Sequence, residues 1–378
     1  MTETRTRLAG LDLFRGLAVA GMIVVNTPGS GQYVWWPLDH AAWNGFTPTD
    51  LVFPAFLFAI GVALALAFPR KVDAAMWRRV ARRTVLLIAI GWAWQMLARP
   101  GIATFRVYGV LPRIGLAYGV VAAFAMLSAR RDAAGRSHLN VVAIAGAAMA
   151  LLLGYWAAMM LVPVPGFGAG QLTPEGNLAG YVDRLLVGTA HMWRFGTDAA
   201  GNVVYDPEGL LSTLPSLANV LFGMLAGTAW QWRPGKAAVS ILLGGIVLVL
   251  LGLMIAPVFP LNKRLWTSSY ALFSSGLSAV LFAACIVASG RASLNRLFAP
   301  CYLLGKNAIL GYMVSLLLGL AGLRLTIGDA TLQARAFAIV ETVVPQPYVA
   351  SAVCALLVLA LVIALLIPLH RRGIHLRL

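Results

Sequence analysis

The stretch DHAAWNGFTPTDLVFPAFLFAIG, residues 39–61, joins a polar segment to an apolar one. Its first half holds acidic, imidazole, indole and amide side chains, whereas the residues after Asp50 carry no charge. The apolar part continues to about residue 68 and is long enough to cross a bilayer, because a spanning helix needs about 20 residues. The stretch therefore predicts a membrane helix with a polar cluster at its lip.

The composition of the whole chain agrees with a membrane protein. Of its 378 residues 60% are hydrophobic and 11% are charged, and the mean hydropathy is +0.83. Soluble domains keep about a quarter of their residues charged. The net charge of +16 sits in short basic clusters between apolar runs, a placement typical of the positive-inside rule. We therefore expect a lipid bilayer, and no nucleic acid, as the partner of these residues.

Ten apolar runs predict an all-α polytopic membrane bundle of about ten transmembrane helices. They cover approximately residues 8–26, 48–68, 80–98, 107–128, 139–162, 210–231, 237–258, 267–288, 299–323 and 348–369. A stretch at 332–344 could add a short interfacial helix. The first run holds Asp12 and Arg15 and predicts a retained helix rather than a signal peptide. Without an internal repeat, residues 1–378 are predicted to form one membrane domain.

The distribution of Lys and Arg predicts that both termini face the cytoplasm. With that topology the inner segments hold 18 of these residues and the outer segments hold 8. Two polar and aromatic loops, about 27–47 and 163–209, then lie outside. Loops of that length are usually functional or disordered, and their Trp, Tyr and Pro blocks favour order.

His40 is the sharpest catalytic candidate in the outer loops. Its imidazole can take a proton from a nucleophile or attack a thioester itself. A nearby carboxylate, either Asp39 or Asp50, can orient the ring, and an amide such as that of Asn44 can stabilise an oxyanion. Asn26, which ends the first apolar run, offers a second amide at the same level. The alternatives, in which His40 and Asn26 only cap helices, remain open on spacing alone.

Charged and amide groups inside the apolar runs suggest an anionic ligand. Arg15 lies three residues after Asp12, so the two can pair on one helix face. Lys306 and Asn307 are predicted at similar depth, and Arg113 lies in another run. Intramembrane charges usually face a cavity or a partner. Structural counter-ions and a binding path for an anion explain these residues equally well.

Other polar residues of the outer face are weaker candidates for binding an acceptor. Trp43, Asp50, Asp183 and Glu208 could contact a carbohydrate or an amine, but pairing within the loops explains the acids at least as well. The three cysteines lie in or beside apolar runs, and no zinc-ligand spacing, Walker loop or nucleophile elbow occurs. We therefore expect no metal.

Several motifs together resemble one known family, the heparan-α-glucosaminide N-acetyltransferases. The resemblance covers nearly the whole chain in order and is carried by RLAGLDLFRGLAVAGMIVVN, HAAWNGFTPTDLVFPAFLFAIG, GVLPRIGLAY, LVPVPGFG, GYVDRLLVG, YDPEGLLSTLPS, LNKRLWTSSY and GKNAILGY. The likeness is closest to a bacterial branch associated with N-acetylglucosamine utilisation. The link between the first two motifs is longer here, and we expect no counterpart of the large N-terminal region and first helix of the animal enzymes.

The resemblance implies a transmembrane acetyltransferase in a bacterial inner membrane. Acetyl-CoA would be the cytosolic co-substrate and an amino sugar, such as glucosamine or a terminal glucosaminide, the acceptor on the periplasmic side. The family's active-site histidine falls on His40, and the asparagine closing its first helix falls on Asn26. Asn44 would assist them, whereas Arg15, Arg113, Lys306 and Asn307 would bind the acetyl donor.

The sequence leaves several alternatives open. The chain could instead be a permease for N-acetylglucosamine or related sugars. Direct transfer to the acceptor and an acetyl-histidine intermediate are both compatible with the residues. The acceptor is also open, and a homodimer is an alternative to a monomer.

Overall fold

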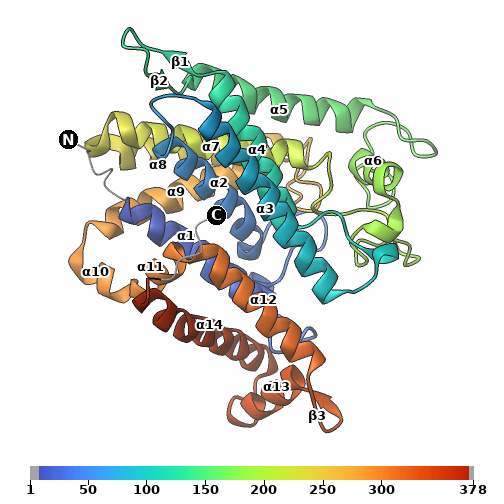
Figure 1. Cartoon of the computed structure of the whole chain (residues 1–378). Helices are drawn as coiled ribbons and strands as arrows, with labels where there is room; N and C mark the ends of the chain where they lie inside the picture. The colour runs from blue at the N-terminus through green and yellow to red at the C-terminus, as the bar shows by residue number, and fades with distance from the viewer. Residues whose placement is uncertain (1–7, 374–378) are drawn as a thin grey trace. The chain divides into compact units, whose positions relative to one another are not determined.

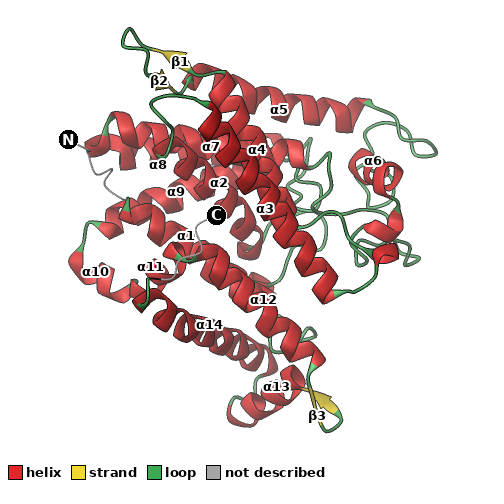
Figure 2. Cartoon of the chain, in the orientation of Figure 1, coloured by secondary structure: helices red, strands yellow, loops and turns green. Residues whose placement is uncertain are grey.

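The computed structural model describes residues 8–373 and is mostly helical, with long loops between some of the helices (Figure 2). Two short antiparallel hairpins, β1–β2 and β3–β4, are the strands of the described part. Figure 1 shows the course of the chain, whose elements are α1 (Ala9–Asn26), η1 (Trp36–Leu38), η2 (Pro48–Leu51), α2 (Val52–Leu66), α3 (Ala74–Ala98), η3 (Ile102–Thr104), α4 (Val110–Leu127), β1 (Arg130–Arg131), β2 (Ser137–His138), α5 (Val141–Leu161), α6 (Leu178–Val187), η4 (Thr189–His191), α7 (Thr213–Trp232), α8 (Pro234–Ile255), α9 (Ser268–Ser289), α10 (Ala292–Leu297), α11 (Ala299–Lys306), α12 (Ala308–Arg324), β3 (Thr326–Ile327), β4 (Ala330–Thr331), α13 (Leu332–Val343) and α14 (Pro347–Arg371).

Within residues 8–373, seven helices are long and apolar enough to cross a membrane, and a bent pair would make an eighth. The chain thus has the helices of a multi-pass membrane protein, but the predicted count of ten is not confirmed. The shortfall lies in α3 and α7, which have 25 and 20 residues but do not reach the same hydropathy. The orientation of the termini stays a prediction, and Arg5, Arg7 and Arg377, on which it partly rests, lie outside the described residues.

The predicted helix over residues 299–323 is wrong in one respect, because the chain bends there. It forms α11 and α12, which meet at an angle of 94°. Asn307 lies between them with φ −124° and ψ 35°, outside the helical region, and its side-chain amide donates to Leu303 O at 3.0 Å. An asparagine that bonds the backbone in this way competes with continued helix. The ambiguous stretch at 332–344 is a 12-residue helix, α13.

The described residues form two compact units. The first contains residues 8–41, 46–56 and 281–373, and the second contains residues 42–45 and 57–280. Helices α2 and α9 contribute residues to both units. The expectation of one membrane domain over residues 1–378 stays a prediction.

In the first unit, α1 packs along α11 and also contacts α12 and α14. The backbones of α1 and α11 approach so closely that glycine is needed at two positions. A Cβ built on Gly16 would lie 1.8 Å from Cys301 O, and one built on Gly305 would lie 1.8 Å from Asp12 O. The paired glycines therefore bring the end of α11 against the first turns of α1.

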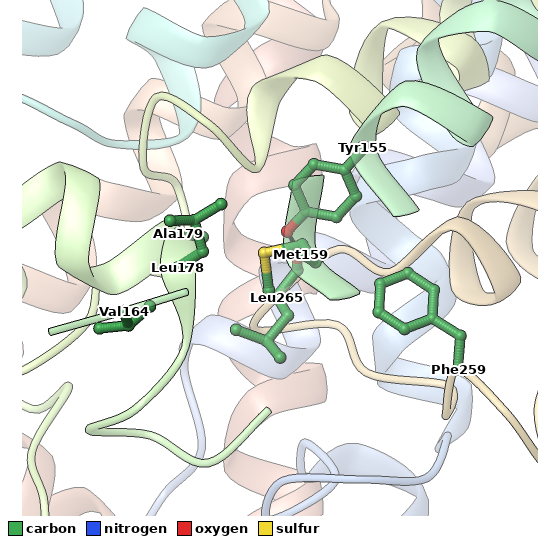
Figure 3. Packing of buried hydrophobic residues seen from close by; sticks show 7 residues of the cluster. All are labelled: Tyr155, Met159, Val164, Leu178, Ala179, Phe259 and Leu265. Atoms are coloured by element: carbon green, nitrogen blue, oxygen red, sulfur yellow. Dashed lines mark hydrogen bonds between the residues drawn. The ribbon is translucent and has the colours of Figure 1, made fainter. Parts of the chain in front are cut away.

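In the second unit, α4 packs against α3 and α7, and α7 also packs against α5 and α8. The long loop between α5 and α7 is anchored by a buried apolar cluster (Figure 3), consisting of Tyr155, Met159, Val164, Leu178, Ala179, Phe259 and Leu265. The hydroxyl of Tyr155 donates to Leu265 O, so the polar end of this ring is satisfied within the cluster. This loop is ordered, as its composition predicted.

We predict that Gly16→Ala and Gly305→Ala each destabilise the protein by about 1–3 kcal/mol, because the added methyl group must push two backbones apart. Gly146→Ala on α5 is the matched control, since nothing lies within 4 Å of its Cβ position. Alanine favours a helix over glycine, so the control should melt at the wild-type temperature or slightly above it. Thermal unfolding in detergent tests this, and equal melting of Gly16→Ala and Gly146→Ala would contradict it.

Candidate functional site

The centre of the candidate site is a short contact between His40 and Asp50 in the first unit. Nδ1 of His40 lies 2.6 Å from Oδ1 of Asp50. The Asp50 side chain is fully buried, whereas 38% of the His40 side chain is exposed. The pair thus combines a fixed carboxylate with an imidazole that solvent can reach.

The loop around the pair is closed by hydrogen bonds to the same carboxylate. Asp50 Oδ2 accepts from the backbone N–H groups of Thr47, at 3.0 Å, and Ala41, at 3.2 Å. The Thr47 hydroxyl donates to Asp39 O at 2.6 Å, and the backbone N–H of His40 donates to Asp39 Oδ1 at 2.8 Å. A buried carboxylate needs such partners, because leaving it without them costs several kcal/mol. The residues on both sides of His40 are therefore held in place.

This arrangement gives His40 a defined chemistry. An ionised Asp50 accepts a hydrogen bond from the Nδ1–H group of His40, so the neutral ring carries its lone pair on Nε2. A histidine fixed in this tautomer can take a proton from an amine, and the carboxylate stabilises the imidazolium that results. The sequence left Asp39 and Asp50 open as partners of the ring and also offered Asp50 for acceptor binding, whereas the structure pairs the carboxylate of Asp50 with His40.

The other predicted residues of the first unit lie on α1 and at the break between α11 and α12. Asn26 is the last residue of α1 and is exposed. Arg15 lies on α1 one residue before Gly16, between the two α1 residues, Asp12 and Gly16, that contact α11. Lys306 is exposed and follows Gly305, whereas Asn307 is 2% exposed. The backbone contact of Gly305 with Asp12 brings Lys306 close to the first turns of α1.

Two residues that follow His40 in the chain belong to the second unit. The indole N–H of Trp43 donates to Leu172 O at 2.8 Å, and its ring packs edge-on against Tyr205 with centroids 4.9 Å apart. Asn44 Oδ1 accepts from Asn262 Nδ2 at 3.0 Å, which leaves the amide N–H₂ group of Asn44 as a donor. Asn44 therefore keeps the donor that an oxyanion would need.

Two acids of the loop before α7 are engaged within the second unit. Arg106 donates to both oxygens of Asp206, at 2.9 and 2.6 Å, and to Glu208 Oε2 at 2.5 Å. Burial opposes the charge of Glu208, but Arg106 and Lys263 outweigh it and lower the pKa of this carboxyl. This ion pair ties the loop before α4 to the loop before α7. Glu208 thus has a structural partner in addition to any ligand.

Asp183 on α6 is fully buried, and its Oδ1 accepts from the backbone N–H of Leu210 at 2.8 Å. Burial raises the pKa of Asp183 to about 7, although the Leu210 N–H lowers it. Burial, reinforced by the charge of Asp183, also raises the pKa of Tyr108. The carboxyl of Asp183 is therefore half protonated near neutral pH.

Arg113 lies in the first turn of α4 and is 2% exposed. Its Nη2 donates to Gly209 O at 2.8 Å and to the Ser212 hydroxyl, and its guanidinium lies 5.1 Å from the ring centroid of Trp266. In the described part of the chain, its Nε and Nη1 have no hydrogen-bond partner. A buried arginine with two unused donors remains compatible with an anionic or carbonyl ligand.

Sequence reasoning missed Arg106, Thr47 and Asn262, although each holds a predicted site residue or its neighbour. Arg106 was counted only toward the topology, because it lies 100 residues from Asp206 and no spacing rule connects them. Thr47 could have been found, since Thr-Pro-Thr-Asp before an apolar run is a helix-start pattern with an acid at the third helical position.

We predict that Asp183→Asn gains stability relative to the wild type as the pH rises. The folded pKa of about 7 exceeds the ordinary value, so the folded state binds the proton more tightly than the unfolded state. Ionisation therefore weakens the wild-type fold progressively between about pH 4 and pH 7, by at most about 4 kcal/mol. Asparagine still accepts from the Leu210 N–H but has no charge to lose. Melting temperatures at about pH 5 and pH 8 test this, and an equal difference at both would contradict it.

Comparison with known proteins gives one family. Residues 7–169 match the family model described as heparan-alpha-glucosaminide N-acetyltransferase, catalytic. The human protein named heparan-alpha-glucosaminide N-acetyltransferase is 31% identical over an alignment covering 81% of this chain and 52% of that protein. The mouse protein of the same name is 30% identical, with coverages of 82% and 54%. The chain spans about half the length of the curated relatives it matches.

The match to the catalytic family model includes the His40–Asp50 pair, together with Asn26 and Asn44. The resemblance carried by the sequence motifs is thereby confirmed: the chain is a relative of the heparan-α-glucosaminide N-acetyltransferases.

Proposed function

We propose that the protein is a membrane-embedded acetyltransferase that moves acetyl from acetyl-CoA to the amino group of an amino sugar. Glucosamine or a terminal glucosaminide is the acceptor that the names of its relatives suggest. The donor would come from the cytoplasm, and the acceptor would be used at the periplasmic face of a bacterial inner membrane. Membership of the bacterial branch linked to N-acetylglucosamine utilisation is part of this proposal.

The observation that carries the proposal is the contact between His40 and the buried Asp50. An amine of a sugar is protonated at neutral pH and must lose a proton to attack a thioester. His40 Nε2 would take that proton, while Asp50 stabilises the imidazolium. As the new C–N bond forms, the C–S bond of the thioester would break, and the coenzyme A thiolate would leave and be protonated. The pair suits a carrier mechanism equally well, because the same tautomer makes Nε2 a nucleophile toward the thioester carbonyl.

The other predicted residues have roles in the same proposal. Asn26 and Asn44 would donate hydrogen bonds to the oxyanion of the tetrahedral intermediate, a contribution typically worth about 100- to 1,000-fold in rate. Arg15, Arg113, Lys306 and Asn307 would bind the acetyl donor. Trp43, Asp183 and Glu208 would support acceptor binding, the two acids by fixing the outer loop through the contacts described above.

We predict that His40→Gln lowers kcat/KM for acetyl transfer by at least about 100-fold, because the transition state loses its base. Asp50→Asn should lower it by a similar or smaller factor, since an amide can donate to Nδ1 and favour the wrong tautomer. Acetylation of glucosamine by the purified protein measures both effects, and unchanged turnover of His40→Gln would sink the proposal.

The matched control is His138→Gln. His138 also contacts a carboxylate, with Nε2 3.0 Å from Asp132 Oδ2, but it lies in the exposed β1–β2 hairpin. This variant should keep wild-type turnover. Incubation with labelled acetyl-CoA without acceptor then separates the two mechanisms: label on His40 supports the carrier, and unlabelled protein with full turnover supports direct transfer.

We also predict strict dependence on acetyl-CoA when the protein is placed in liposomes. A permease, which the family resemblance does not favour, would move labelled N-acetylglucosamine across the membrane without it. The acetyltransferase should instead form N-acetylated sugar only when acetyl-CoA is present. Uptake of free sugar without acetyl-CoA at a rate that matches or exceeds acetylation would contradict the prediction.

A further inference from the structure

A cavity in the first unit is lined by α10, by α11 and by the C-terminal end of α14. Its volume is about 370 Å³, which falls in the usual range of small-molecule sites. The polar residues that line it are Asn295, Tyr302, Lys306, His370 and Arg371. The proposed function uses only Lys306 from this set.

In the described part of the chain, the ionisable groups that line the cavity include bases but no carboxylates. Lys306 and Arg371 come from helices that are separated by 40 residues of sequence, and His370 adds a third cation when it is protonated. None of the described residues that line the cavity is Asp or Glu. Basic residues at helix C-termini also offset the helix dipole, but that role does not require two helices to direct them to one cavity. Like charges placed together repel each other, and an anion between them relieves the repulsion.

The uncharged wall of the cavity is pre-organised. The Tyr302 hydroxyl donates to Asn295 Oδ1 at 2.7 Å, and Asn295 Nδ2 donates to Ser289 O at 3.1 Å. The amide therefore keeps one further N–H for a ligand. Apolar side chains, among them Leu303 and Ile367, complete the lining. Cationic groups together with an amide and an aromatic ring suit a phosphate group carried on a larger, partly apolar molecule.

The cavity also adjoins residues that the proposed function assigns to the acetyl donor. Lys306 follows Gly305, which contacts Asp12 O on α1, and Arg15 lies on the next turn of that helix. A molecule whose phosphates lie in the cavity could therefore extend along α1.

We propose that this cavity binds the phosphate groups of a nucleotide, namely the 3′-phosphorylated ADP portion of the acetyl donor, with Lys306 and Arg371 as its charged partners. The inference rests on the proposed function and deepens it by assigning Asn295, Tyr302, His370 and Arg371 to the site. The phosphate of an anionic lipid headgroup has the same chemistry and is the competing source.

Adenosine 3′,5′-bisphosphate is a suitable probe, because it carries phosphates but neither the pantetheine arm nor the acetyl group. Calorimetric titration of the full-length protein in detergent should show that Lys306→Gln and Arg371→Gln each raise its Kd about tenfold, the effect of losing one charge-assisted contact. Tyr302→Phe, which keeps the ring, should raise it by a smaller factor. Arg372→Gln is the matched control, since it removes the same charge one residue away from the lining and should bind as the wild type does.

Equal affinities of Arg371→Gln and Arg372→Gln for the probe would overturn the inference. So would a loss of co-purified phosphatidylglycerol in Arg371→Gln with no change in probe binding, since that result assigns the cavity to lipid. Titration of wild-type protein with acetyl-CoA keeps the two proposals apart. No binding of acetyl-CoA by the wild type would contradict the proposed function, whereas tight binding with an Arg371-independent probe affinity contradicts only the inference.

Discussion

The buried carboxylate of Asp50 is the constraint on which the candidate site depends. It lies directly before the apolar helix α2, where an ionised group without partners would be very costly. The chain satisfies it by folding residues 40–47 over it, so that two backbone N–H groups and His40 reach its oxygens. The same contacts that stabilise the buried carboxylate before α2 also orient the imidazole of His40. The carboxylate of Asp50 therefore contributes both to the stability of this loop and to the chemistry of His40.

A second constraint acts where α1 packs against α11. Two glycines allow α1 and α11 to touch backbone to backbone, and Asn307 then ends α11 with a sharp bend. Before that bend, α11 lines the cavity along its length, and Lys306 at its C-terminus is the last residue that it contributes. The short broken helix thus brings Lys306 both to α1 and to the cationic cavity.

Much of the fold could be predicted from hydropathy, because an apolar run of about 20 residues has few alternatives to a helix in a bilayer. The bend at Asn307 could not, since the run from 299 to 323 stays apolar on both sides of it. His40 and Asp50 could be found because they lie ten residues apart in the polar segment that precedes α2. Arg106 was not found, because its partners Asp206 and Glu208 follow it by 100 residues or more. Pairs that lie so far apart in the sequence form through tertiary packing, which the spacing of residues in the sequence does not predict.

A double-mutant cycle on kcat/KM for acetyl transfer tests the central claim most directly. The rates of His40→Gln, Asp50→Asn and the variant with both changes are compared with the wild type. If Asp50 acts by orienting His40, removing Asp50 should cost almost nothing once His40 is gone, and the double variant should be about as slow as His40→Gln alone. Fully additive losses would show that the two residues act independently and would contradict the account.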